Sequence, residues 1–248
     1  MKRKRLDLSV GTILSEISLA KNNLIDVEEF RALYGSDKTM SKVAGIYESY
    51  EKEKEKKYLL DFDDLLLETY FLLSEHESIR EKYAGRYHHV LIDEFQDTNP
   101  VQLEIIKLII DADSNNDKSY WIAGDDWQSI YSFAGASVNN ILNFQSTFSS
   151  SRLFILNINY RSTPQILKAC QNLISHNVRK IEKTLKTDNQ DGDNVIVLES
   201  SSEEGEALSI INEVRDLVDN RGYSYKDIAV LYRANFQSRV VEETFAQM

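Results

Sequence analysis

Features that would identify a function at once are scarce in this chain of 248 residues. It has one cysteine, Cys170, which excludes a disulfide framework and is typical of a protein in a reducing cytoplasm. No apolar run approaches the roughly 20 residues that a helix needs to cross a bilayer, and the basic residues at the start lack the apolar core of a signal peptide. We therefore expect a cytoplasmic globular protein without a membrane partner.

Two further absences concern phosphate and nucleic acid. None of the nine glycines is followed by Lys, so the pattern Gly-x-x-x-x-Gly-Lys-Ser/Thr, which surrounds the phosphates of a nucleotide, does not occur. The 29 Lys and Arg against 40 Asp and Glu give a net charge of −11, which is not what a nucleic-acid binder usually shows. Charge alone does not exclude a nucleic acid, because aromatic side chains can bind single strands without much basic surface.

The most informative stretch that is present covers residues 90–99, where an apolar run ends in three acids within five residues. It predicts a buried strand that delivers carboxylates to a sheet edge. There Asp93 and Glu94 could hold a phosphate-bound Mg²⁺ and orient water. The alternative is that Asp93 only ends the strand and that Asp97, Thr98 or Asn99 caps the next helix.

Two more segments repeat this pattern. Residues 119–123 run into Gly124 and two acids, and residues 153–156 run into a polar loop. Short strands that end in polar loops and are followed by helical patterns predict βα units with a parallel sheet, hence an α/β fold. We also expect strands at 195–198 and 227–232, a mainly helical region up to residue 57, and helices beginning near 61 and at 101–110, 138–148, 164–177 and 203–218.

Five strings of the sequence closely resemble, in the family's order, those of the superfamily 1 DNA helicases of the UvrD, Rep and PcrA type. They are DFDDLL at 61–66, DEFQDTN at 93–99, GDDWQSIYSFAGA at 124–136, LNINYRS at 156–162 and IAVLYRANFQSR at 228–239. The resemblance implies parts of two RecA-like (P-loop NTPase) parallel-sheet domains plus a helical insertion subdomain. Residues 1–57 would belong to the insertion, 58–154 to the C-terminal half of the first RecA-like domain, and 155–248 to the N-terminal part of the second.

The resemblance also implies ATP and Mg²⁺ as cofactors and a role for each matching residue. Asp93 and Glu94 would hold Mg²⁺, and Glu94 would also accept a proton from the attacking water. Gln128 would sense the γ-phosphate, unless it simply caps the next helical turn. Arg161 would be an arginine finger that reaches the phosphate only when the two domains close. Tyr160 would stack on adenine, the alternative being a core tyrosine at a strand end.

DNA contact is expected at Tyr131 and Phe133, because aromatic rings stack on any base and grip a single strand regardless of sequence. The alternative is that the rings are part of the core. Where the family commonly has Trp and then Arg, this chain has Phe133 and Ala134, so any phosphate contact at Ala134 is lost. Trp127 replaces a usually smaller or polar residue, and the sequence gives it no role.

Arg233, Gln237 and Arg239 match the last of the five strings, so they are further candidate site residues. Helix capping and surface pairing would explain them equally well.

The resemblance thus implies an ATP-dependent 3′-to-5′ DNA helicase that acts on single-stranded DNA and duplex junctions. Since the family's P-loop lies upstream of the matching segment, we expect an internal fragment that is inactive alone. One alternative is a metal-dependent nuclease that uses Asp93, Glu94, Asp125 and Asp126 and cleaves DNA without a nucleotide. Another is a non-catalytic module that binds DNA or protein.

Overall fold

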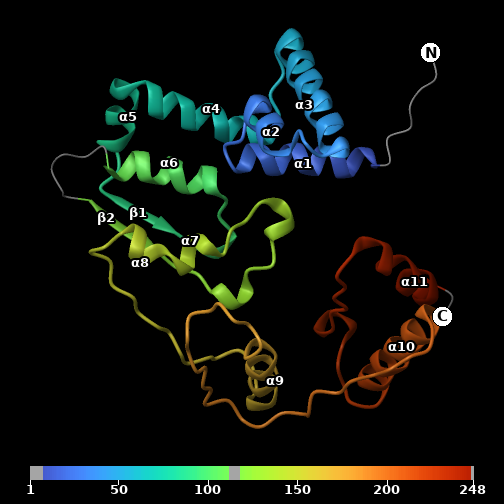
Figure 1. The fold of residues 1–248 in the computed structure, drawn as a ribbon. Coiled ribbons are helices and arrows are strands. Elements are labelled where there is room, and N and C mark those ends of the chain that lie inside the picture. The colour runs from blue at the N-terminus through green and yellow to red at the C-terminus, as the bar shows by residue number, and fades with distance from the viewer. Residues whose placement is uncertain (1–7, 112–117, 247–248) are drawn as a thin grey trace, which may run out of the picture. The chain divides into compact units, whose positions relative to one another are not determined.

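The computed structural model describes residues 8–111 and 118–246 (Figure 1). The chain divides into two compact units. The first contains the described residues up to Asn157 together with Ile174–Thr184, and the second contains Ile158–Leu173 and the chain from Leu185 onward. The backbone therefore passes between the units three times, after Asn157, Leu173 and Thr184. The domain bounds inferred from the sequence stay a prediction.

The first unit begins with a helical part. Its helices are α1 (Val10–Asn22), α2 (Val27–Tyr34), α3 (Lys38–Lys57), α4 (Phe62–Glu75) and α5 (Glu77–Ala84). Side chains of Ser9, Asp26, Asp37 and Asp61 cap the first four, which explains where each helix starts. A hydrophobic core joins α1, α2 and α3 and consists of Ile13, Ile17, Ala20, Phe30, Val43, Ala44 and Tyr47. The helical interpretation of this region is confirmed.

A parallel βαβ unit follows. Strands β1 (His89–Ile92) and β2 (Ser119–Ile122) pair in parallel, with His89 opposite Ser119, and α6 (Pro100–Asp111) lies between them in sequence. Figure 1 shows α6 on one side of the strands and the short helices α7 (Asn139–Leu142) and α8 (Phe144–Thr147) on the other. The parallel pairing predicted for these two strands is confirmed, but the strand before Asp93 is not buried as expected, since Leu91 is 73% exposed.

The helix expected at 138–148 is interrupted. Asn143 has φ −97° and ψ 5°, which ends α7, and α8 begins at the next residue. Asparagine forms helices poorly because its short amide competes for nearby backbone groups. The sequence prediction of one continuous helix was therefore wrong at this residue.

The strands expected at 153–156, 195–198 and 227–232 were also wrong. Over residues 8–111 and 118–246 the sheet consists of β1 and β2, and the second unit adds one isolated parallel bridge between Ile158 and Lys186. Val197 is 90% exposed and Leu231 93% exposed, so neither segment lies under a covering layer. Strand propensity depends on a neighbouring strand and on burial, and these segments have neither in the described residues.

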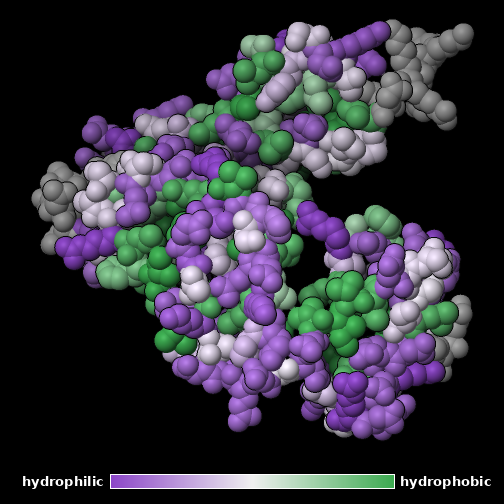
Figure 2. All heavy atoms as spheres, turned by 60° about the horizontal axis from the view of Figure 1, so that its bottom comes forward, coloured by the Kyte–Doolittle hydropathy of each residue, from purple (hydrophilic) through white to green (hydrophobic). Residues whose placement is uncertain are grey.

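The second unit is helical. It contains most of α9 (Pro164–Ile174), then α10 (Glu203–Asp219) and α11 (Asn235–Ala246), and α10 packs against α11. Ser202 caps α10, and three glutamates in its first turn complement the positive end of the helix. Hydrophobic patches show on the molecular surface in Figure 2. No helix among the described residues combines the length and apolar character needed to cross a membrane.

Candidate active site

The ends of the two strands bring the predicted acids next to the Gly124 loop. Beyond the strands, the ladder continues through hydrogen bonds from Ala123 N to Ile92 O at 2.8 Å and from Phe95 N to Ala123 O at 3.0 Å. Glu94 adopts a left-handed conformation, with φ 49°, which turns the chain so that Phe95 enters the core. Non-glycine residues held in this conformation cluster at active sites. Asp93 and Glu94 remain exposed at the carboxyl end of β1.

Gln96 connects Glu94 to the loop after β2. Its buried side chain donates from Nε2 to Glu94 Oε2 at 2.8 Å, and its Oε1 accepts a hydrogen bond from Asp125 N at 2.9 Å. The amide has to approach the backbone closely at Gly124. A Cβ at that position would lie 2.7 Å from Gln96 Oε1, which explains the glycine.

Asp125 extends this path to Gln128. Its Oδ2 accepts a hydrogen bond from Gln128 Nε2 at 2.7 Å, and its Oδ1 accepts one from Trp127 N at 3.0 Å. Burial alone would raise the pKa of the Asp125 carboxyl, but hydrogen bonds from Lys183 and Gln128 outweigh it and hold the pKa below its usual value. The structure therefore joins two sequence-predicted residues, Glu94 and Gln128, through Gln96 and an ionised Asp125.

The carboxylates of Asp93 and Glu94 are the type of ligand that the predicted Mg²⁺ needs. Asp93 Oδ1 accepts a hydrogen bond from Glu94 N at 2.9 Å, and Glu94 Oε2 is held by Gln96. Carboxylate oxygens are the ligands that Mg²⁺ prefers, and Mg²⁺ at nucleotide sites is commonly held by one or two carboxylates together with phosphate oxygens. The acids at the end of β1 therefore suit an ion that a nucleotide helps to bind.

Asp125 and Asp126 do not gather with Asp93 and Glu94 into a four-acid centre. In the described residues, the group of three or more acids close enough to share a metal is Glu51, Asp61 and Asp64, in another part of the unit. Asp126 is buried and accepts hydrogen bonds from Lys183 and the backbone, as Asp125 does. The nuclease alternative thus lacks its expected metal-binding geometry.

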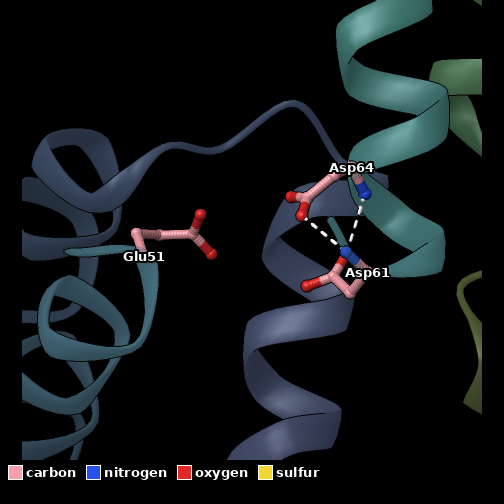
Figure 3. Close-up of side chains that lie close together, drawn as sticks. All are labelled: Glu51, Asp61 and Asp64. Atoms are coloured by element: carbon pink, nitrogen blue, oxygen red, sulfur yellow. Dashed lines mark hydrogen bonds between the residues drawn. The ribbon is translucent and has the colours of Figure 1, made fainter. Parts of the chain in front are cut away.

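The group Glu51, Asp61 and Asp64 holds lysine ammonium groups. In Figure 3, Glu51 of α3 points toward the two aspartates at the start of α4, which are joined to each other by the capping hydrogen bonds. Lys21 Nζ lies 2.8, 2.8 and 2.7 Å from carboxylate oxygens of Glu51, Asp61 and Asp64, and Lys54 contacts the same three acids. Two cations thus occupy the centre of this ionic cluster.

Tyr131 and Phe133 form an exposed aromatic pair near Gln128. Their ring centroids are 5.8 Å apart with planes tilted by 42°. Tyr131 is 48% exposed and Phe133 69% exposed, so the alternative that these rings are core residues is wrong. Gly135 ends this loop with φ 88°, and a Cβ there would meet Asn22 at 3.1 Å.

Asn22, the last residue of α1, supports both loops. Its Oδ1 accepts a hydrogen bond from the Asn99 amide, and its Nδ2 donates to Asp63 Oδ1 at 3.1 Å. Asn99 in turn caps α6, because its Oδ1 accepts from Gln102 N at 2.8 Å, which confirms one of the three capping possibilities. The helical part of the unit therefore contacts both residues 93–99, the acidic loop, and residues 124–136, the aromatic loop.

Tyr160 and Arg161 lie in the second unit, directly before α9. Asn159 Oδ1 accepts hydrogen bonds from Arg161 N at 2.9 Å and Ser162 N at 2.7 Å, which shapes the turn. Both the tyrosine and the arginine are exposed, so the alternative of a core tyrosine is wrong. Their roles toward a nucleotide stay a prediction.

The residues of the last string have local contacts. Gln237 Oε1 accepts a hydrogen bond from Ala234 N at 2.8 Å at the start of α11, and Arg239 Nε pairs with Glu243 at 2.7 Å one turn later. Arg233 lies in the loop before this helix. The contacts of Gln237 and Arg239 agree with the capping and surface-pairing alternative.

Sequence reasoning missed Gln96, Asn22 and Lys183. Gln96 stands inside a string that was recognised, two residues after Glu94, so its spacing was a usable signal. Lys183 contacts Asp125 across 58 residues of sequence, and Asn22 contacts Asn99 across 77. No local pattern reports contacts of that range.

The acids of this parallel βαβ unit lie beyond the carboxyl ends of its strands, where α/β proteins with open sheets bind their ligands. Comparison with known families specifies the class further. The chain matches the UvrD/REP helicase N-terminal domain over residues 2–149 and the UvrD-like helicase C-terminal domain over residues 154–248. It therefore belongs to the UvrD/REP helicase family.

Its relatives include the ATP-dependent DNA helicase PcrA of Leuconostoc citreum, which is 34% identical over 254 residues, with 100% of this chain and 33% of that protein covered. PcrA of Bacillus subtilis (strain 168) is 35% identical over 249 residues, covering 98% and 33%. UvrD1 of Mycobacterium tuberculosis (strain ATCC 25618 / H37Rv) is 37% identical over 238 residues, covering 93% and 31%. The chain spans about a third of the length of these relatives.

Proposed function

We propose that this chain is part of a cytoplasmic, ATP-dependent 3′-to-5′ DNA helicase, and that it supplies both a catalytic acid and a grip on single-stranded DNA. The observation that carries the proposal is the hydrogen-bonded path from Glu94 through Gln96 and Asp125 to Gln128. Family membership and relatives named ATP-dependent DNA helicases support it.

The acids at the end of β1 would perform the first part of the chemistry. Transfer of a phosphoryl group to water needs metal placement, orientation of the water and stabilisation of charge on the phosphate oxygens. Mg²⁺, when bound, neutralises part of that charge. Asp93 and Glu94 would hold it, and Glu94 would accept the proton of the attacking water. Gln96 fixes the Glu94 carboxylate from the buried side, which keeps the acceptor oxygen in one orientation.

Gln128 would detect the γ-phosphate and pass its state to the DNA. A neutral amide can hydrogen-bond both phosphate and water, and this one begins a loop whose aromatic pair starts three residues later. Tyr131 and Phe133 would stack on DNA bases, each worth about 1–3 kcal/mol of binding free energy. A shift of Gln128 on hydrolysis then displaces rings that hold a base, which is what movement along a strand requires.

The second unit would complete the nucleotide site. Arg161 would act as the arginine finger and Tyr160 would stack on adenine, so closure of the two units would depend on the bound nucleotide. Because the sequence contains no P-loop pattern, we expect this chain by itself to turn over no ATP.

The test replaces the matching third of Bacillus subtilis PcrA with this chain. The chimera should hydrolyse ATP faster when single-stranded DNA is added and should unwind a duplex with a 3′ tail. Glu94→Gln should lower kcat about 100-fold or more while ATP binding persists, and Glu68→Gln, at an exposed acid of α4, should not.

Two outcomes would contradict the proposal. The first is a failure of the chemistry: a folded chimera binds ATP and DNA but hydrolyses no ATP, or its ATP hydrolysis is unaffected by Glu94→Gln. The second is cleavage of DNA by the unaltered chain with Mg²⁺ and no nucleotide, which would favour the nuclease alternative. Measurable ATP turnover by the chain alone, abolished by Glu94→Gln, would overturn its expected inactivity.

A further inference from the structure

Residues Ile174–Thr184, called the return segment below, have an unusual place in the chain. They belong to the first unit, whereas the chain immediately before and after them belongs to the second. The segment has internal contacts of its own, because Lys180 Nζ donates to Ser175 O at 3.2 Å and to Asn177 O at 3.0 Å. A piece of the first unit is thus joined by peptide bonds to the second unit at both ends.

Lys183 attaches the return segment to the loop after β2. Its Nζ lies 2.6 Å from Asp125 Oδ1 and 2.7 Å from Asp126 Oδ1, and its side chain is only 11% exposed. The backbone of Ile181 adds a hydrogen bond to Asp126 Oδ2 at 2.7 Å. An ammonium group bound by two carboxylates away from water interacts much more strongly than an exposed surface pair.

Trp127 departs from the family pattern, and its contact with Lys183 gives a structural explanation for the tryptophan. Lys183 Nζ lies 4.7 Å from the centroid of its indole ring, within the range of a cation–π interaction. The indole Nε1 is buried and has no hydrogen-bond partner in the described residues, so a hydrogen bond does not account for the position of the ring. The ring instead lies over the cation that binds the neighbouring acids.

The same acid that binds Lys183 also binds Gln128. Lys183 Nζ donates a hydrogen bond to Asp125 Oδ1 at 2.6 Å, and Gln128 Nε2 donates one to Asp125 Oδ2 at 2.7 Å. A carboxylate held on one oxygen cannot rotate away from a partner on the other oxygen without breaking a charge-assisted hydrogen bond. The orientation of the Gln128 amide therefore depends on the lysine of the return segment.

We propose that Lys183 is a positioning residue that fixes Gln128 through Asp125, and that the return segment thereby links the second unit to this glutamine. Because the segment is joined to the second unit at both ends, a movement of that unit would change the position of Lys183 and, through it, of the Asp125 carboxylate. That this link regulates ATP hydrolysis rests on the proposed function of Gln128. The positioning itself rests on the contacts.

The first experiment uses the chain alone and needs no activity. The side-chain amide signals of Gln128 are followed by ¹⁵N NMR and assigned by their loss in Gln128→Ala. Lys183→Met should move them to the positions of a solvent-exposed glutamine, and Lys183→Arg, which keeps a charged donor, should restore them. Lys168→Met, at an exposed lysine of α9, serves as the matched control and should leave them in place.

Fluorescence gives a second readout of the same contact. In a Trp121→Phe background, Trp127 is the remaining tryptophan, since the chain has two. Lys183→Met should increase acrylamide quenching of Trp127 about twofold or more. If Lys183→Met does not fold, as circular dichroism would show, Lys183→Gln replaces it, with the same expectations. Unchanged Gln128 amide signals in a folded Lys183 variant would overturn the proposal.

The third experiment uses the PcrA chimera. Lys183→Met should lower kcat about tenfold, with the KM for ATP within about twofold of the parent, and adding it to Gln128→Ala should cause no further loss, because the two residues act through one contact. Independent, multiplied losses would refute the regulatory part. If the chimera hydrolyses no ATP at all, the proposed function fails, while the NMR result still decides whether Lys183 positions Gln128.

Discussion

Replacement of Lys21 by methionine should remove a central stabilising contact of the first unit. Lys21 is 1% exposed and joins α1 to three acids on α3 and at the start of α4. Removing one partner of a buried ion pair costs about 3–5 kcal/mol, because the opposite charge is left without compensation. Lys54 still contacts the same acids, so we expect a loss of about 3 kcal/mol, the lower end of that range.

Urea unfolding followed by circular dichroism measures this loss. With a slope of about 2 kcal/mol per molar urea, a loss of about 3 kcal/mol lowers the midpoint by about 1.5 M. The matched control is Lys52→Met, which removes a lysine of α3 that pairs with Glu48 at 2.6 Å on the surface and should leave the midpoint unchanged within error. Equal midpoints for the parent and Lys21→Met at pH 7 would refute the reasoning.

The stability lost in Lys21→Met should depend on pH, and the pKa values of its partners give the direction. Burial alone would raise the pKa of the Asp61 and Asp64 carboxyls, but hydrogen bonds from Lys21 and Lys54 outweigh it, holding the pKa of Asp61 well below the usual 3.8 and lowering that of Asp64. A carboxyl whose pKa is lowered by folding adds stability above its ordinary pKa and loses it as the pH falls through the lowered value. The difference between the parent and Lys21→Met should therefore be full at pH 7 and shrink below about pH 4. A difference that grows on acidification would contradict this.

Three further substitutions test other parts of the site. Gly124→Ala forces a Cβ to within 2.7 Å of Gln96 Oε1 and should cost about 1–3 kcal/mol in thermal unfolding, so an unchanged Tm would count against the Gln96 bridge. Tyr131→Ala or Phe133→Ala should weaken the binding of an oligo(dT) strand to this chain about fivefold to 150-fold, as measured by fluorescence anisotropy. Equal affinities of the parent and the variant would exclude stacking. Asn22→Ala should cost about 1–3 kcal/mol and speed amide exchange in the acidic and aromatic loops, and unaltered exchange would show that these loops do not depend on α1.

Much of the first unit could be predicted because its signals are local. Asp61 marks the start of α4 by capping it, and the apolar runs before Asp93 and Gly124 become the two paired strands. Caps and periodic apolar positions act within one or two turns or a single strand, so a short window of sequence contains their cause. The placement of Glu94 and Gln128 near one sheet edge follows from these strands.

The remainder depends on contacts between distant parts of the chain. The segment at 195–198 has the composition of a strand, yet a strand needs a partner that supplies backbone hydrogen bonds, and composition cannot say whether one is near. Lys183 is an ordinary lysine in a polar stretch until the fold brings it to Asp125. Long-range partners of this kind became visible only with the structure.

Three largely buried lysines form ion clusters with the acids of the first unit. Lys21, Lys54 and Lys183 each bind at least two carboxylates and are largely shielded from water. Lys21 and Lys54 share Glu51, Asp61 and Asp64, and Lys183 pairs with Asp125 and Asp126, so acids outnumber lysines by one in each cluster. In a chain with 29 basic and 40 acidic residues, these clusters therefore do not account for the acidic balance, which the rest of the chain carries. If Tyr131 and Phe133 bind a single strand as proposed, the affinity there should depend more on the ring faces than on basic charge.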